Sequence, residues 1–161
     1  MPDLEEQILE YLRTHHTMTL GTCLGGVPWN ATVFYASDGF RLHFFSAPDS
    51  RHCMNLATNP RVAVTVQEDY ADWREIKGIQ LQGTVELVDS VIAKGKAMAV
   101  YARKYPSVIR LFTDPSSGVY HRAFLKVKFY RVIPETVYFI DNQQGFGKRQ
   151  ELTLGAQAGS R

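Results

Sequence analysis

Apolar side chains recur at every second position along several segments of this 161-residue chain, and a period of two predicts β-strands. Residues 17–24 alternate in this way and lead into Gly25-Gly26, a dipeptide typical of a tight hairpin. The returning strand, 27–36, carries apolar or aromatic side chains on both of its faces. Such a strand has to be covered on both sides, as in a barrel whose outer face packs against a partner or a ligand.

The other strands follow the same alternation and are predicted over residues 40–46, 61–67, 76–88, 123–133 and 136–140. Gly78 and Gly83 interrupt the longest of them and indicate a bend or a bulge, at which barrel strands curve. Pro134 separates the last two strands. The pattern predicts a mainly β fold of the α+β class, in which six or seven antiparallel strands form a barrel with flanking helices.

Apolar residues at helical spacing precede and interrupt these strands. Asp3 and the glutamate three residues later form a capping-box pattern at the start of a predicted helix over residues 3–14. Asp89 is expected to cap a second helix that ends at Lys104, and its inward-facing residues are expected to be Val91, Ile92, Met98 and Tyr101. Pro106 opens a third, short helix. Both later helices are expected to lie outside the barrel.

The composition is that of an ordinary globular protein, with 45% hydrophobic residues and a formal charge of +2. We expect a single domain over residues 1–152 and a flexible, polar tail over residues 153–161. The well-mixed charges provide no basic stripe for nucleic acid and no polybasic patch for a membrane. The sequence has no leader-like or membrane-spanning apolar run and only two cysteines, so the expected location is the cytoplasm.

The segment 43–66 joins a strand, a short helix and a second strand. Ser50 is positioned to cap this helix, which places Arg51 and His52 in its first turn. A helix N-terminus presents unpaired N–H groups and the positive end of the helix dipole, so cations there serve an external anion better than they serve the helix. The pattern therefore indicates a bound phosphate group. The alternative is a surface helix in which Arg51 pairs with Asp49.

No side chains are arranged in a pattern typical of catalysis. The five histidines show no metal-ligand spacing, and neither a nucleophile elbow nor a P-loop is present. The acidic residues fall mostly in loops and on helix surfaces, which argues against paired carboxylates. We therefore predict no catalytic side chain and no metal site. The chemistry is expected to belong to a bound cofactor that the protein orients.

A glycine-bearing segment, 141–152, follows the last predicted strand. Gly145 and Gly147 permit close approach of the backbone to a ligand, and Lys148 and Arg149 can reach an anion. One interpretation is a flap that closes over a cofactor. The other interpretation is a solvated extension.

Over residues 4–152, the order of elements and the motif FFSAPDSRHCMNLATNPRVAVTV resemble the FMN-binding split β-barrel proteins, the family related to pyridoxamine 5′-phosphate oxidase. In that family a small or hydroxyl residue follows an aromatic pair, and the motifs S-R-K and N-P come next. The resemblance implies a split β-barrel of the FMN-binding type, and a homodimer with FMN in the cleft between the subunits. It also implies that Arg51 and His52 hold the FMN phosphate, while the backbone from Asn30 to Val33 lines the isoalloxazine ring.

Either Gln80 or Gln82 is expected to face the ring by the same resemblance. The cofactor-binding residues predicted from the resemblance and the two anion-binding patterns are Asn30, Ala31, Thr32, Val33, Phe45, Ser46, Ser50, Arg51, His52, Gln80, Gln82, Lys148 and Arg149.

Two features depart from the family pattern. His52 stands where the oxidase has a phosphate-binding lysine, and it holds its charge only in part near neutral pH. We therefore expect FMN binding that is weaker or pH-dependent. The oxidase also carries an R-L-H-D-R substrate motif, whereas this chain has GFGKRQEL over residues 145–152. This difference argues against oxidation of pyridoxamine phosphate.

The sequence predicts a homodimeric, FMN-dependent oxidoreductase that passes hydride or electrons from a nicotinamide donor to an unidentified small molecule. Two alternatives remain open. One is a non-catalytic module that binds or stores flavin, which the lack of acid–base side chains permits. The other is a haem-handling protein, because some split barrels bind haem, with His15, His16 or His121 as ligands.

Overall fold

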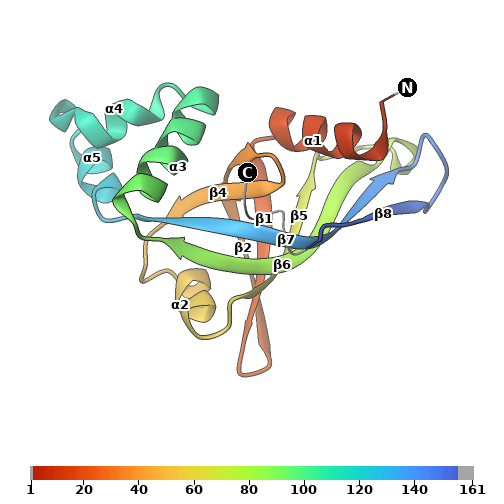
Figure 1. The fold of residues 1–161 in the computed structure, drawn as a ribbon, viewed down its shortest axis with the longest axis horizontal. Coiled ribbons are helices and arrows are strands. Elements are labelled where there is room, and N and C mark those ends of the chain that lie inside the picture. The colour runs from red at the N-terminus through yellow and green to blue at the C-terminus, as the bar shows by residue number, and fades with distance from the viewer. Residues whose placement is uncertain (1, 156–161) are drawn as a thin grey trace.

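The computed structural model describes residues 2–155, which form one curled antiparallel sheet with helices on its outside (Figure 1). The strands are β1 (Thr17–Leu24), β2 (Val27–Phe34), β3 (Ala36–Asp38), β4 (Arg41–Ser46), β5 (Arg61–Gln67), β6 (Lys77–Val88), β7 (Lys128–Asp141) and β8 (Arg149–Thr153). The α-helices are α1 (Leu4–Thr14), α2 (Arg51–Thr58), α3 (Val91–Lys104), α4 (Val108–Thr113) and α5 (Val119–Phe124), and the 3₁₀-helices are η1 (Trp73–Glu75) and η2 (Pro115–Ser117). None of the helices described is long and apolar enough to cross a membrane.

The sheet has the strand order β2-β1-β5-β6-β7-β4-β3, and β8 pairs with the second half of β7. It curls until β2 lies near β4, where Thr32 to Phe34 of β2 and Phe45 of β4 line the same pocket. No strand pairing within residues 2–155 joins β2 to β4, so the barrel stays split along this line. The predicted antiparallel split barrel is confirmed.

The β1–β2 hairpin and α1 form as the sequence predicts. Gly25 and Gly26 both have positive φ, 58° and 78°, which is the backbone of a tight turn matched to twisted strands. Asp3 accepts a hydrogen bond from the Glu6 N–H in a complete capping box. The inward positions of β1, β5, β6 and β7 form the core, and Ile8 and Leu12 of α1 pack on it. Local sequence patterns therefore predict α1 and the β1–β2 hairpin correctly.

The C-terminal strands differ from the prediction. Residues 123–133 and 136–140 were expected to be two strands, yet β7 is continuous, because Pro134 lies at a bulge opposite Gly83. A Cβ at position 83 would lie 2.1 Å from the Ile133 carbonyl oxygen, so the close approach at the bulge requires glycine. The predicted bend at Gly83 is confirmed.

Other segments add or move elements. Residues 123 and 124, which were expected to begin a strand, belong to α5, while β3 and β8 give the sheet eight strands where six or seven were predicted. β8 includes Thr153, and the Leu154 N–H donates to the Glu135 carbonyl, so ordered chain continues past residue 152. The rest of the expected tail, residues 156–161, lies outside the described residues.

The prediction for α3 was wrong in its cap and in part of its buried face. Ser90, and not Asp89, accepts a hydrogen bond from the Ala93 N–H and caps the helix. Val91 and Ile92, which were expected to face inward, are 86% and 75% exposed. The first turn projects beyond the sheet, so burial begins further along the helix, and Ala97 and Tyr101 are its buried residues.

Candidate functional site

The candidate site begins at the N-terminus of α2, directly after β4. Ser46 ends β4, and the Ser50 N–H donates to the Ala47 carbonyl across the turn that leads into the helix. On the other face of α2, Asn55 donates from Nδ2 to Thr22 Oγ1 of β1 at 3.0 Å, in a fully buried contact. The helix is therefore fixed against the barrel, and its first turn is held beside the end of β4.

The first turn of α2 has no internal partner for its N–H groups. The Ser50 side chain makes no capping hydrogen bond, although Ser50 occupies the predicted N-cap position. The first helical backbone bond runs from the Met54 N–H to the Ser50 carbonyl. Within residues 2–155, the N–H groups of Arg51, His52 and Cys53 are thus available to an external acceptor.

His52 explains why the Ser50 hydroxyl does not cap the helix. Its Nε2 lies 2.7 Å from Ser46 Oγ and 3.2 Å from Ser50 Oγ, so the imidazole holds both hydroxyls at the helix start. The ring is only 8% exposed, and burial lowers the pKa of His52 below its ordinary value of 6.5. The ligand-free protein therefore favours the neutral imidazole, which contacts the two hydroxyls, and a direct role of His52 in binding phosphate stays a prediction.

Arg51 is the cation of this site. Its guanidinium carbon lies 4.2 Å from the centre of the Trp29 ring of β2, in a cation–π contact that joins α2 to β2. The alternative in which Arg51 pairs with Asp49 is not observed, and no other carboxylate in the described part of the chain pairs with Arg51. Its charge is therefore free to attract an anion.

An apolar pocket of about 520 Å³ lies between β2, β4 and the helices α3 to α5, and no residue of the α2 turn lines it. Phe45, next to Ser46 in β4, packs at this wall with its ring centre 4.5 Å from that of Tyr101. The full lining is Thr32, Val33, Phe34, Phe45, Tyr101, Tyr105, Ser107, Val108, Leu111 and Phe124. Because β2 ends the sheet order, its unpaired backbone edge borders the same groove.

The predicted glutamines lie elsewhere on the protomer. Gln80 and Gln82 point to the outer face of β6 and line a separate groove of about 370 Å³ together with Asn30. β1 and β5 separate β6 from β2, so the two strands are roughly 14 Å apart at ordinary strand spacing. This groove shares only Asn30 with the predicted β2 residues, and it includes no residue of the α2 turn or of the pocket between β2 and β4.

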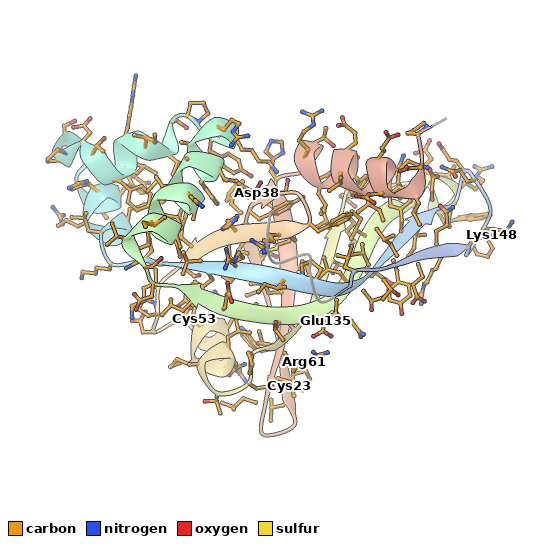
Figure 2. All side chains as sticks on the ribbon, in the orientation of Figure 1. Cys23, Asp38, Cys53, Arg61, Glu135 and Lys148 are labelled. Atoms are coloured by element: carbon orange, nitrogen blue, oxygen red, sulfur yellow. The ribbon has the colours of Figure 1, made fainter. Side chains whose placement is uncertain are left out.

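The glycine-bearing turn is also remote from α2. Figure 2 places Lys148 and the α2 residue Cys53 on opposite sides of the molecule. Phe146 packs edge-on against Trp73, with ring centres 5.0 Å apart, and Arg149 begins β8. The turn therefore does not cover the α2 site of its own protomer.

The structure separates the predicted residues into groups. Ser46, Ser50, Arg51 and His52 lie at the start of α2, while Thr32, Val33 and Phe45 line the apolar pocket and Ala31 precedes Thr32 in β2. Asn30 lines the outer groove with Gln80 and Gln82, and Lys148, followed by Arg149 at the start of β8, lies on the opposite side of the molecule from α2. The prediction missed the wall formed by Tyr105, Leu111 and Phe124, because it assigned residue 124 to a strand and gave no position to the helices relative to β2.

Comparison with known proteins agrees with this architecture. The family model described as "Pyridoxamine 5'-phosphate oxidase" matches residues 4–141. The chain belongs to this family. A UPF0306 protein of Yersinia pseudotuberculosis is 30% identical to it over 150 residues, which cover 92% of each chain.

Two solved structures share the fold of this family member. The haem-binding protein of Mycobacterium smegmatis has a TM-score of 0.73 at 18% identity, and the match covers 95% of this chain but 59% of that protein. HutZ, the haem storage protein of Vibrio cholerae, has a TM-score of 0.64 at 21% identity over 83% of this chain and 92% of that one. At these identities the likeness shows the split-barrel fold alone.

The neutral state of His52 predicts a pH dependence of stability. Because burial lowers the pKa of His52, the unfolded chain takes up this proton at a higher pH than the folded chain does. The free energy of unfolding should therefore fall as pH decreases below 6.5. Urea titrations of ligand-free protein at about pH 7.5 and about pH 5.5 should show a smaller pH effect in His52→Asn than in the unmodified protein.

The matched control is His16→Asn, since His16 is exposed and should leave the pH effect unchanged. Buried His43, whose pKa burial also lowers, contributes equally to the unmodified protein and to both variants. An identical pH effect in His52→Asn and the unmodified protein would show that His52 is not held neutral by the fold.

Proposed function

We propose that this chain is a homodimeric, FMN-binding oxidoreductase whose α2 N-terminus holds the flavin phosphate. The observation that carries the proposal is the open first turn of α2. There the three free N–H groups, the hydroxyls of Ser46 and Ser50, and the unpaired guanidinium of Arg51 converge. All of these groups can donate hydrogen bonds, as a phosphate dianion requires.

The groove beside this turn fits a planar ring. The free edge of β2 from Asn30 to Val33 offers backbone donors and acceptors, and Trp29 of the same strand lies against Arg51. The Arg51–Trp29 contact therefore brings the phosphate donors of α2 beside the edge of β2. This continuity supports a ligand that carries both a phosphate and a planar ring.

When bound, FMN would supply the hydride- or electron-transfer chemistry. The chain's own residues would perform the positioning: Arg51 and the first-turn N–H groups fix the phosphate, His52 fixes the hydroxyls, and the β2 edge orients the ring. The helices α3 to α5 wall the separate apolar pocket at the far end of β2. A nicotinamide nucleotide is the proposed donor, and the acceptor is a small molecule.

A second subunit would complete the site. Val27, Trp29 and Phe34 of β2 are between 40% and 58% exposed in one protomer, on a strand that has a free edge. The predicted cofactor residues on β6 and near β8 cannot reach the α2 site of their own chain. A partner that packs on β2 would cover these apolar side chains and could bring its own Gln80, Gln82, Lys148 and Arg149 to the groove.

The haem alternative is supported by the names of two structural neighbours, but less by the residues of this chain. The side chains that line the apolar pocket include no histidine, cysteine or methionine. His15 stacks on Tyr11 and contacts Glu68, while His121 is hydrogen-bonded to the Leu111 carbonyl. Neither residue lines the pocket. FMN therefore fits the donors of the groove better than haem does.

Replacing Arg51 tests the phosphate anchor. Arg51→Ala removes a charge-assisted contact of about 1.5 to 3 kcal/mol, so FMN should bind more than about tenfold more weakly in a fluorescence titration. The matched control is Arg74→Ala, because Arg74 pairs with Asp72 in η1 and should not affect FMN binding. Equal FMN affinity in Arg51→Ala and the unmodified protein would remove the α2 assignment.

Bleaching of the bound flavin by NADPH would favour an enzyme over a storage module.

A mixed dimer tests whether the site spans two subunits. One subunit carries Arg51→Ala, the other carries Lys148→Ala with Arg149→Ala, and different affinity tags select the heterodimer. Suppose that each site takes Arg51 from one subunit and Lys148 and Arg149 from the other. One site of the heterodimer then loses all three cations, and the other site keeps all three. The heterodimer should then bind one FMN with unmodified affinity.

The two parent homodimers serve as controls, since each should bind FMN weakly at both sites. A heterodimer without any site of unmodified affinity would place Arg51 and the tail cations in the same subunit's site. A stable FMN-loaded monomer in light scattering would also contradict the shared site.

A further inference from the structure

The apolar pocket beside the proposed flavin groove is lined by a tyrosine hydroxyl on its helical wall that the fold leaves unused. Tyr101 of α3 lines this pocket and is only 1% exposed, yet its hydroxyl has no hydrogen-bond partner among residues 2–155. Its neighbour Tyr105 donates to the Tyr35 carbonyl at 2.8 Å, and Tyr35 donates to the Leu12 carbonyl at 2.8 Å. Buried tyrosines normally bond their hydroxyls within the protein, so the free hydroxyl of Tyr101 is open to an acceptor atom in the pocket.

The Tyr101 hydroxyl is suited to a neutral acceptor. Burial raises the pKa of Tyr101, so the hydroxyl stays protonated at neutral pH and can donate a hydrogen bond. None of the residues that line the pocket carries a charge to balance an ionic ligand. An uncharged group such as a carbonyl oxygen therefore matches the pocket better than a carboxylate or an ammonium group does.

The shape and lining of the pocket indicate a planar, aromatic ligand. Its volume of about 520 Å³ is enough for a ring system of two or three fused rings. Aromatic side chains enter from β2, β4, α3 and α5, and Phe45 contacts the rings of Tyr101 and Phe124 at 4.5 and 5.1 Å between centres. Edge and face contacts of this kind favour an aromatic ligand over a flexible chain.

The wall that carries Tyr101 is fixed to the barrel. Lys104, one turn further along α3, donates to the carbonyls of Leu12 and His15 at the end of α1. The Tyr105 hydroxyl adds its bond to Tyr35. The pocket is therefore preformed, with Tyr101 held at a constant position relative to β2 and β4.

We propose that this pocket binds uncharged, planar aromatic compounds through a carbonyl oxygen that accepts a hydrogen bond from Tyr101. The assignment of these compounds as the substrate class rests on the proposed flavin function, because Thr32 and Val33 border both the pocket and the flavin groove. The binding itself depends only on residues of this chain.

The probe is 9-fluorenone, an unreactive tricyclic ketone, and its matched hydrocarbon is fluorene. Titration of the purified dimer, followed by tyrosine and tryptophan fluorescence, should show saturable binding of fluorenone. Tyr101→Phe should weaken fluorenone by about three- to tenfold, the range for one net hydrogen bond, and leave fluorene unchanged. The 2-carboxylate of fluorenone should bind at least about tenfold more weakly than fluorenone, because the pocket offers its charge no partner.

A second variant confirms the location. Leu111→Asp should weaken fluorenone and fluorene alike, and if it fails to fold, Leu111→Trp fills the same wall without adding charge. Equal fluorenone binding in Tyr101→Phe and the unmodified protein, or no saturable binding by the folded protein, would overturn the proposal.

Arg51→Ala separates the aromatic pocket from the flavin function, since this variant should lose FMN affinity and keep fluorenone affinity. Fluorenone binding to a protein that never binds FMN would support the pocket and contradict the flavin function.

Discussion

The contact of His52 with Ser46 and Ser50 is the interaction on which the site depends. It joins the end of β4 to the start of α2, and it turns the Ser50 hydroxyl away from the N–H groups that a serine at this position usually caps. The helix loses a cap, which typically stabilises it by about 1 kcal/mol, and its first turn keeps N–H groups without an internal partner. The buried neutral imidazole is therefore a positioning group, and the cationic role falls to Arg51.

The split of the barrel gives this turn its surroundings. Since β2 and β4 approach each other without pairing, the free backbone edge of β2 extends from Trp29, which contacts Arg51, to the pocket beside the helices α3 to α5. One end is polar and able to donate hydrogen bonds, and the other end is apolar and aromatic. A ligand with a phosphate at one end and a ring at the other matches this gradient. The exposed apolar side chains of β2 make the same groove a natural place for a second subunit.

The sequence predicted the features that depend on neighbouring residues. The capping box of α1, the Gly25-Gly26 hairpin and the strand bend at Gly83 each follow from a few adjacent positions, and all are confirmed. The continuous β7 was missed because Pro134 is tolerated only through a bulge that involves a distant strand. The buried face of α3 was placed too early, because its first turn, with Val91 and Ile92, is exposed.

The sequence predicted only those features of the site that neighbouring residues determine. The S-R-H sequence placed Arg51 and His52 correctly in the first turn of α2, but the neutral state of His52 depends on burial against residues outside that segment. A period of two placed Gln80 and Gln82 on one face of β6, yet it could not show that β1 and β5 lie between them and β2. The free hydroxyl of Tyr101 likewise emerges only once the helices are packed against the barrel.

The measurement that tests the central claim most directly is the ratio of the affinities for FMN and riboflavin in the unmodified protein. The two ligands share the isoalloxazine ring and differ in the phosphate, so the ratio isolates what the α2 turn contributes. If the N–H groups, hydroxyls and Arg51 hold the phosphate, FMN should bind at least about tenfold more tightly than riboflavin, because charge-assisted hydrogen bonds are each worth about 1.5 to 3 kcal/mol. Equal affinities for the two ligands would contradict a phosphate site at the start of α2.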